Sequence, residues 1–359
     1  MSDRKLKVGI LGMGRMGSIH ASNFSFKVPR AHVIAACDER QERLDWAKGA
    51  LPADVKYYLN VDDMFKNSGI EAVLIATETS KHAELAEKAW SYGLHVFLEK
   101  PISVDVETSK RVVENSKNYP NLKTMVGFVR RFDESNAELK SMIDSGSLGK
   151  IHMLRSGSTD PYDPSGFFVK FSATSGGIFT DVGVHDVDQA RWMVGVPEGC
   201  LNPKREVHRV FALGQSVQHP ELTKLGDADN GVGIVEFTNG VVFTCHLGRT
   251  QQNGHECYCE VYGTEQKVII NGQAAANRME IRDKHGVRIE SHDSHFTRFK
   301  EAFVSELQAF TACILDDKPL PVDLYDALQA SKITTALTHS FHKGVPVYFD
   351  EEGEIIVPQ

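Results

Sequence analysis

The stretch Lys7-Val8-Gly9-Ile10-Leu11-Gly12-Met13-Gly14-Arg15-Met16-Gly17 decides the fold of the first part of this 359-residue chain. An apolar run over residues 7–11 precedes three glycines in the pattern GxGxxG, and residues 14–24 then have the composition of a helix. The first glycine permits a tight turn, the second lets a pyrophosphate approach the backbone, and the third lets helix and strand pack closely. A strand, a glycine loop and a helix in this order predict a dinucleotide-binding site.

An acidic residue in the expected place supports this prediction. Asp38 follows the second apolar run and lies 21 residues beyond Gly17. A carboxylate there can accept hydrogen bonds from the adenosine ribose hydroxyls, and it repels a 2′-phosphate. The sequence therefore favours NAD over NADP. Arg40 and Arg43 leave an alternative open, because either could meet a 2′-phosphate if Asp38 turned away.

Strands and helices alternate through the first third of the chain, which predicts parallel βαβ units. The expected strands are residues 7–11, 33–37, 72–76, 95–98 and 123–127. The expected helices are residues 14–24, 41–49, 81–92 and 104–117. We expect a doubly wound parallel sheet, and a Rossmann domain over residues 1–127.

The pattern changes near residue 128, and residues 128–359 are predicted to form a second, α+β domain. After a helix over residues 135–145, the β-like runs are residues 207–213, 233–237, 241–247, 258–262 and 268–270, with Asn239-Gly240 as a hairpin turn. We expect a mostly antiparallel sheet, interrupted by a helix over residues 181–194. Helices over residues 296–315 and 324–342 and a strand over residues 345–349 follow.

Composition excludes several classes of protein. The net charge of −8 argues against a nucleic-acid partner and a basic membrane-surface protein. No apolar stretch reaches the roughly 18 residues of a membrane span, so no span is expected, and the residues before the first strand do not predict a secretory signal. The six scattered cysteines suit reduced thiols in a cytoplasmic enzyme. Cys257-x-Cys259 lacks a second ligand pair, and His292, His295, His339 and His342 are expected to be surface or core residues, so no metal site is predicted.

Three residues indicate the chemistry. Lys100, in Glu99-Lys100-Pro101, follows a predicted buried strand, and ligands of doubly wound sheets bind beyond the carboxyl ends of the strands. Asp181 and His185 are four residues apart at the start of a predicted helix, a spacing that places them on one face. Taken alone, Asp181 could be only an N-cap and His185 a packed helix residue. In a dinucleotide-binding protein, a histidine is a suitable base for removing a hydroxyl proton.

These motifs resemble those of the glucose–fructose oxidoreductase and inositol 2-dehydrogenase family. The resemblance rests on the glycine loop, on Glu99-Lys100-Pro101, on the run over residues 127–133 and on the segment over residues 176–186. It covers nearly the whole chain and is strongest to inositol 2-dehydrogenases. It implies a Rossmann domain followed by an open-faced, mostly antiparallel sheet domain, which often forms the interface of homodimers or homotetramers.

The resemblance also implies the site residues. Lys100, Asp181 and His185 are the expected catalytic set, and the expected substrate-binding residues are these three with Asp160 and His255. The expected cofactor-binding residues are Gly12, Gly14, Arg15, Met16, Gly17, Asp38, Arg40, Thr77, His82, Glu99, Lys100 and Arg130. The chain departs from the inositol dehydrogenase pattern after Asp160-Pro161, at residues 253–256 and at residues 77–79. The reaction type therefore follows from the resemblance better than the substrate does.

The expected reaction is oxidation of a secondary hydroxyl on a cyclic polyol or sugar. His185 takes the hydroxyl proton, Lys100 binds the same oxygen, and Asp181 binds a neighbouring hydroxyl. Two other enzymes remain open: an aldose 1-dehydrogenase, and a reductase of a keto-inositol or keto-sugar. A catalytically silent dinucleotide sensor is an alternative of another class, although such relatives are expected to lose the lysine or the histidine.

Overall fold

The computed structural model describes residues 4–194 and 205–357. It divides into two compact units. The first comprises Met1–Phe132 and Glu301–Leu328, and the second comprises Asp133–Lys300 and Gln329–Gln359. The predicted domain boundary at residue 128 stays a prediction. In the described part of the chain, no helix has the length and apolar character needed to cross a membrane.

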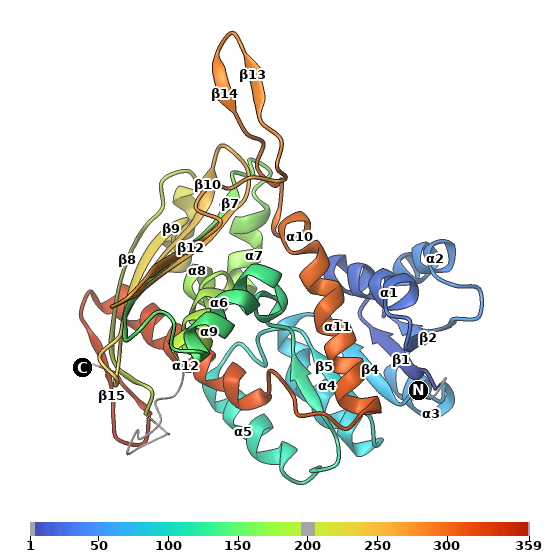
Figure 1. The fold of residues 1–359 in the computed structure, drawn as a ribbon. Helices are drawn as coiled ribbons and strands as arrows, with labels where there is room; N and C mark the ends of the chain where they lie inside the picture. Colours follow the sequence, from blue (N-terminus) through green and yellow to red (C-terminus); the bar gives the residue numbers. More distant parts are fainter. Residues whose placement is uncertain (1–3, 195–204, 358–359) are drawn as a thin grey trace. The chain divides into compact units, whose positions relative to one another are not determined.

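A parallel six-stranded sheet forms the centre of the first unit (Figure 1). Its strands are β1 (Leu6–Leu11), β2 (Ala31–Cys37), β3 (Lys56–Tyr58), β4 (Ala72–Ile75), β5 (His95–Leu98) and β6 (Thr124–Val126). Their order is β3-β2-β1-β4-β5-β6, and every pair is parallel. The four residues of β4 are fully buried, as expected of a strand covered on both faces. The predicted Rossmann sheet is confirmed.

Helices connect these strands, and one helix from the far end of the chain joins them. The helices are α1 (Arg15–Lys27), α2 (Gln41–Ala50), α3 (Val61–Asn67), α4 (Thr79–Ser91), α5 (Val106–Ser116), the 3-10 helix η1 (Val129–Phe132) and α11 (Lys300–Leu315). The ring of Phe310 on α11 lies 5.6 Å from that of Phe97 on β5. Neither β3 nor α3 was predicted from the sequence.

The strand order of the first unit reverses between β1 and β4, which creates a crevice for ligands at the carboxyl ends of these strands. Gly12 follows β1, and Ala76 follows β4. A Cβ atom on Gly12 would lie 2.6 Å from the carbonyl oxygen of Ala76, so the two loops touch. The glycine loop therefore lies at the topological switch point.

The second unit contains an eight-stranded sheet in the order β12-β11-β7-β10-β9-β8-β15-β16. The strands are β7 (Ile151–Pro161), β8 (Val207–Gln215), β9 (Asn230–Phe237), β10 (Val242–Gln251), β11 (Glu256–Gly263), β12 (Lys267–Ile270), β15 (Val347–Phe349) and β16 (Ile355–Ile356). Among the described strands of this sheet, only β7 and β10 pair in parallel, which confirms the predicted mostly antiparallel sheet.

One face of this sheet is covered by helices, and the other is open (Figure 1). The helices of this part of the chain are α6 (Glu134–Asp144), α7 (Phe167–Ser175), α8 (Gly177–Asp181), α9 (Gly183–Val194), the 3-10 helix η2 (Pro220–Leu225), α10 (His295–Arg298) and α12 (Leu324–Lys343). Along β9, Val235 is fully buried, whereas Val232 and Ile234 are more than two-fifths exposed. This alternation is typical of an antiparallel sheet with one solvent-facing side.

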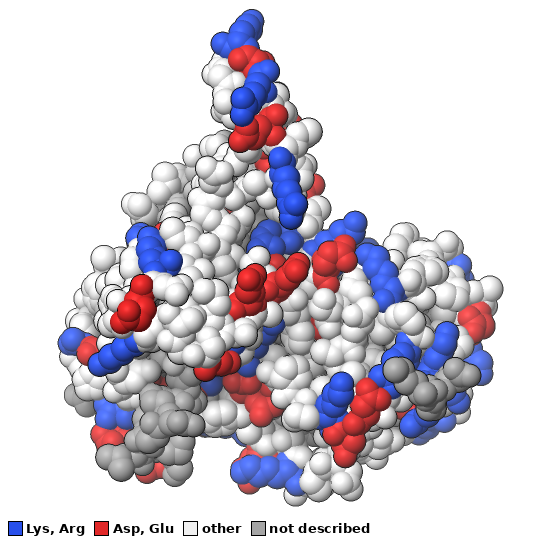
Figure 2. Space-filling view, in the orientation of Figure 1, with Lys and Arg blue, Asp and Glu red and all other residues white. Residues whose placement is uncertain are grey.

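A hairpin of β13 (Ile281–Asp283) and β14 (Gly286–Arg288) stands away from the large sheet (Figure 1). Basic and acidic side chains crowd it, and both signs are interspersed over the face shown in Figure 2. The hairpin was not predicted, because its strands are charged and only three residues long.

Candidate functional site

The structure assigns a different task to each glycine of the GxGxxG loop. Gly12 has a φ of 90°, which favours glycine. A Cβ atom on Gly17 would lie 1.7 Å from the carbonyl oxygen of Gly12, so only glycine fits there. A Cβ atom on Gly14 would meet nothing within 4 Å, which leaves room for a ligand beside the first turn of α1. Arg15 and Met16 begin this 13-residue helix, whose N-terminus favours an anionic group.

Asp38 lies directly after β2 and is tied to the glycine loop. Its Oδ2 accepts a hydrogen bond of 2.8 Å from the Met13 N–H. Its Oδ1 accepts hydrogen bonds from the backbone N–H of Arg40 at 2.9 Å and from the Arg40 Nε at 3.3 Å. The Arg40 side chain is thus held by the carboxylate.

Buried histidines join the loops that follow β4 and β5. His82 Nδ1 donates a hydrogen bond of 2.8 Å to the carbonyl oxygen of Pro101, and its Nε2 lies 3.2 Å from that of Thr77. Burial lowers the pKa of His82 despite these two carbonyl groups. A neutral imidazole here fixes the position of the loop that contains Lys100.

Glu99 and Arg130 are also buried residues of the first unit. Glu99 Oε1 accepts a hydrogen bond of 2.6 Å from His20 Nε2, and its Oε2 accepts one of 3.3 Å from the Lys100 N–H. Burial opposes the charge of Glu99, but the bond from His20 holds its pKa below the ordinary value. Arg130 lies in η1, directly after β6. Every residue predicted to bind the cofactor therefore belongs to the first unit.

Asp181 and His185 belong to the second unit, but they do not share one helix. Asp181 is the last residue of α8, and His185 is the third residue of α9. The prediction of a single helix beginning at Asp181 is wrong. Gly176, with a φ of 82°, separates α7 from α8, and Gly177, with a φ of 81°, begins α8. A Cβ atom on Gly183 would lie 2.9 Å from Leu247 Cδ1, so glycine permits the close approach of α9 to the sheet.

A buried arginine holds the carboxylate of Asp181. Arg249, on β10, has no exposed side-chain surface, and its Nη2 donates a hydrogen bond of 3.0 Å to Asp181 Oδ2. Its Nη1 lies 3.7 Å from Asp227 Oδ2. Arg249 was not predicted from the sequence. A clue was present, because Phe243, Cys245, Leu247 and Arg249 continue one buried period-two pattern.

Asp160 precedes one departure from the inositol dehydrogenase pattern, His255 lies within another, and the two side chains form a pair. His255 Nδ1 donates a hydrogen bond of 3.1 Å to Asp160 Oδ1, and the His255 side chain is only 4% exposed. Burial opposes the charged ring, but the bond to Asp160 and the neighbouring Cys257 raise the pKa of His255 to about 9. An imidazolium–carboxylate pair is therefore expected at neutral pH.

His295 links this pair to His185. The His295 ring lies 5.3 Å from the ring of His185 and 5.7 Å from that of His255. The backbone N–H of His255 donates a hydrogen bond of 2.7 Å to the His292 carbonyl oxygen, and this bond fixes the segment that contains His295. His292 and His295 were expected to be surface or core residues rather than metal ligands, and the ring of His295 also contacts two predicted site residues. Among the described residues, no group of three or more His, Cys, Asp or Glu side chains could hold a metal ion.

Known proteins match the chain in both of its halves. A model of the oxidoreductase family with an NAD-binding Rossmann fold matches residues 6–128, and a model of the GFO/IDH/MocA C-terminal domain matches residues 136–269. The chain therefore belongs to the GFO/IDH/MocA family of NAD-binding oxidoreductases. This finding confirms the resemblance, the fold class and the NAD cofactor predicted from the sequence.

Several of the similar proteins are inositol dehydrogenases. The scyllo-inositol 2-dehydrogenase (NAD(+)) of Bacillus subtilis is 32% identical, over 97% of both chains. The myo-inositol 2-dehydrogenase of Thermotoga maritima is 29% identical, over 96% of this chain and 99% of that protein. A similar solved structure is the crystal structure of scyllo-inositol dehydrogenase from Lactobacillus casei with bound NAD(H) and scyllo-inositol. Its sequence is 33% identical to this chain, the match covers 96% of this chain and 99% of that one, and the two structures superpose with a TM-score of 0.89.

Proposed function

We propose that this protein oxidises a secondary hydroxyl group of an inositol or a related cyclic polyol. NAD, when bound, accepts the hydride from the carbon that bears this hydroxyl. The observation that supports the proposal most strongly is the full-length similarity to inositol dehydrogenases, together with the presence of all three expected catalytic residues, Lys100, Asp181 and His185.

Each of these residues has a proposed role in the reaction. His185 removes the proton of the reacting hydroxyl, so that a carbonyl forms as the hydride leaves. Lys100, at the carboxyl end of β5, binds the oxygen on which negative charge develops. Asp181 accepts a hydrogen bond from a neighbouring hydroxyl and orients the ring. We propose further that the Asp160–His255 pair binds other hydroxyls of the substrate.

Initial rates with NAD and NADP across inositol isomers and common aldoses test the substrate class. We expect the highest kcat/KM with NAD and an inositol. Faster turnover of aldoses would favour an aldose 1-dehydrogenase, and faster turnover of ketones with NADH would favour a reductase. Binding of NAD without any turnover would favour a dinucleotide sensor and refute the proposal.

A substitution tests the role of His185. His185→Ala should lower kcat by about 10²–10⁴, the usual contribution of general base catalysis, while NAD binding changes little. His285→Ala, in the exposed turn of the β13–β14 hairpin, is the matched control and should keep wild-type kinetics. Unchanged kcat in His185→Ala would contradict its assignment as the base.

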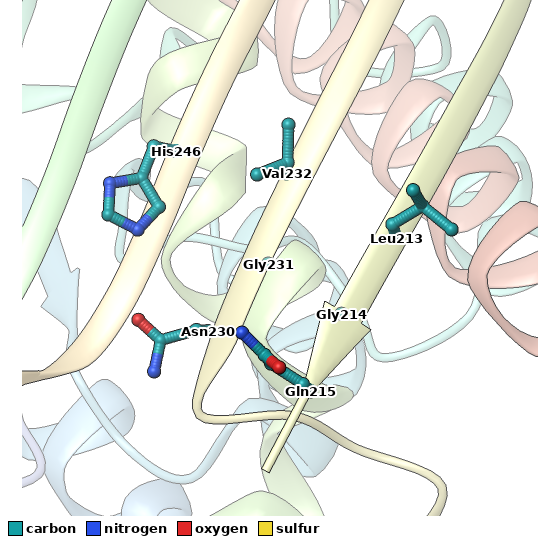
Figure 3. A pocket seen from close by; sticks show the side chains of 7 residues that line it. All are labelled: Leu213, Gly214, Gln215, Asn230, Gly231, Val232 and His246. Atoms are coloured by element: carbon teal, nitrogen blue, oxygen red, sulfur yellow. The ribbon is translucent and has the colours of Figure 1, made fainter. Parts of the chain in front are cut away.

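We also propose that two copies of the chain associate through the open face of the large sheet. Leu213, Val232, Ile234 and Ile269 project from this face with 41–60% of their surface exposed. Figure 3 shows Leu213, Val232 and His246 on three neighbouring strands, with helices behind the sheet. Exposed apolar patches of this kind mark association surfaces. Val232→Asp should shift the mass in sedimentation from a dimer or tetramer to a monomer, and a wild-type monomer would contradict the proposal.

A further inference from the structure

Arg249 is a wholly buried cation shared by two carboxylates. Its Nη2 hydrogen-bonds to Asp181, its Nη1 lies 3.7 Å from Asp227, and its Cζ lies 5.1 Å from the centre of the Phe168 ring. A buried charge is costly unless opposite charges and hydrogen bonds stabilise it. The hydrogen bond to Asp181, the charge of Asp227 and the aromatic face supply stabilisation of this kind, whereas Nε and Nη1 make no hydrogen bond to the described residues.

Asp227 fixes the other end of the same short helix. Its Oδ1 accepts a hydrogen bond of 2.8 Å from the Ile178 N–H, in the first turn of α8. Its Oδ2 accepts one of 2.6 Å from the Ser172 hydroxyl on α7. A five-residue helix is too short to be stable alone. Helix α8 is thus anchored at its start by Asp227 and at its end by Arg249.

We infer that Arg249 is a positioning residue for the oxidation reaction, because its ion pair fixes the orientation in which Asp181 meets the substrate. This inference rests on the proposed function. A strand is a more rigid support for such a residue than a loop. Arg249 is held in β10, where its backbone N–H donates a hydrogen bond of 2.9 Å to the Asp229 carbonyl oxygen. The planar fork of an arginine can contact both carboxylates, which the single ammonium of a lysine does less well.

Removal of the guanidinium should therefore impair use of the polyol selectively. For Arg249→Met we expect kcat/KM for the polyol to fall by about 10- to 100-fold, because small displacements of orienting groups have effects of this size. The KM for NAD should not change. Arg191→Met serves as the control, because it also removes a buried ion pair of the second unit. In the wild type, Arg191 Nε lies 2.6 Å from Glu206 Oε2. The control should reduce thermal stability while leaving both KM values within about threefold.

A double-mutant cycle separates positioning from general stabilisation. If Arg249 acts through Asp181, the double variant Arg249→Met/Asp181→Asn should have the same kcat/KM as Asp181→Asn alone. A purely structural role of Arg249 predicts that the two losses multiply. Calorimetric titration of the polyol into the enzyme–NADH complex should show the same non-additivity in affinity.

A conservative variant covers the case in which Arg249→Met does not fold. Arg249→Lys keeps the charge but loses the fork, and we expect a several-fold rise in the polyol KM that disappears in the Asp181→Asn background. Multiplying losses, or an equal rise in the KM for NAD, would overturn the inference. Turnover of a polyol by the wild-type enzyme is measured first. Its absence would refute the proposed function itself, an outcome distinct from a failure of the Arg249 cycle.

Discussion

The Asp160–His255 pair should make the stability of the second unit depend on pH. His255 has a pKa of about 9 in the folded protein, against the ordinary value of 6.5. A histidine with a raised pKa contributes stability that is fully present below about pH 6.5 and is lost as the pH rises through about 9. The difference between these two values corresponds to about 3 kcal/mol, at about 1.36 kcal/mol per pH unit.

Asp160→Asn removes the negative charge and keeps the size of the side chain. The asparagine accepts a weaker hydrogen bond, so the pKa of His255 should fall toward or below its ordinary value, because burial of the ring then dominates. The variant should be about 1–3 kcal/mol less stable than the wild type near pH 6.5, and this difference should shrink near pH 9.5.

Urea unfolding at several pH values between about 6 and 9.5 measures this difference directly. Other titrating groups contribute equally to both proteins and cancel in the comparison. Ring-proton NMR supplies the pKa of His255, with His255→Gln identifying the resonance. A difference in unfolding free energy that stays constant across this pH range would refute the proposed coupling, and so would a His255 resonance that titrates near pH 6.5 in the wild type.

Three further substitutions test other parts of the first unit. Gly17→Ala places a methyl group 1.7 Å from the Gly12 carbonyl oxygen, so NADH affinity measured by fluorescence should fall by about tenfold or more. Asp38→Ser releases the Arg40 side chain to meet a 2′-phosphate, and the ratio of kcat/KM for NADP to that for NAD should rise; an unchanged ratio would contradict the role given to Asp38. Glu306→Gln should stabilise the protein more at pH 8 than at pH 5 in thermal unfolding. Burial and the charge of Glu99 raise the pKa of Glu306 above that of the unfolded chain, so ionisation of this group favours unfolding increasingly as the pH rises.

The sequence predicted the strands of the first unit well because they are buried on both faces. The predicted strand over residues 95–98 coincides with β5. Strand β3 was missed because its three residues lie at the sheet edge and are half-buried or exposed, without an apolar run. The predicted helix over residues 296–315 is interrupted at Phe299, which lies between the four-residue helix α10 and α11. Periodicity alone did not predict this break.

The glycines around α8 explain why Asp181 was misplaced. Composition predicted a helix over residues 181–194, and α9 does cover most of it. The turn at Gly176 and Gly177 creates a separate short helix that precedes it, and the sequence contains no apolar periodicity long enough to predict such a helix. Asp181 is thus not an N-cap. It lies at a helix end, where a distant cation is needed to hold it.

The partners of the candidate site residues could not be predicted, because they depend on strand register. Gly248 on β10 and Glu256 on β11 both pair with Thr159 on β7. This register brings Arg249, Asp160 and His255 to the same end of three adjacent strands, although they are distant in sequence. The one parallel pair in the sheet, β7 with β10, makes their carboxyl ends coincide, and the sequence gives no sign of it.

The same arrangement gives the two proposed substrate-binding carboxylates of the second unit a buried cation each. Arg249 pairs with Asp181, and His255 pairs with Asp160. A carboxylate anchored in this way keeps one orientation, which is required to distinguish equatorial from axial hydroxyls on a ring. The Arg249 pair involves a permanent charge and the His255 pair a titratable one. We therefore expect recognition at Asp160 to weaken above about pH 9, where His255 loses its charge, while recognition at Asp181 persists.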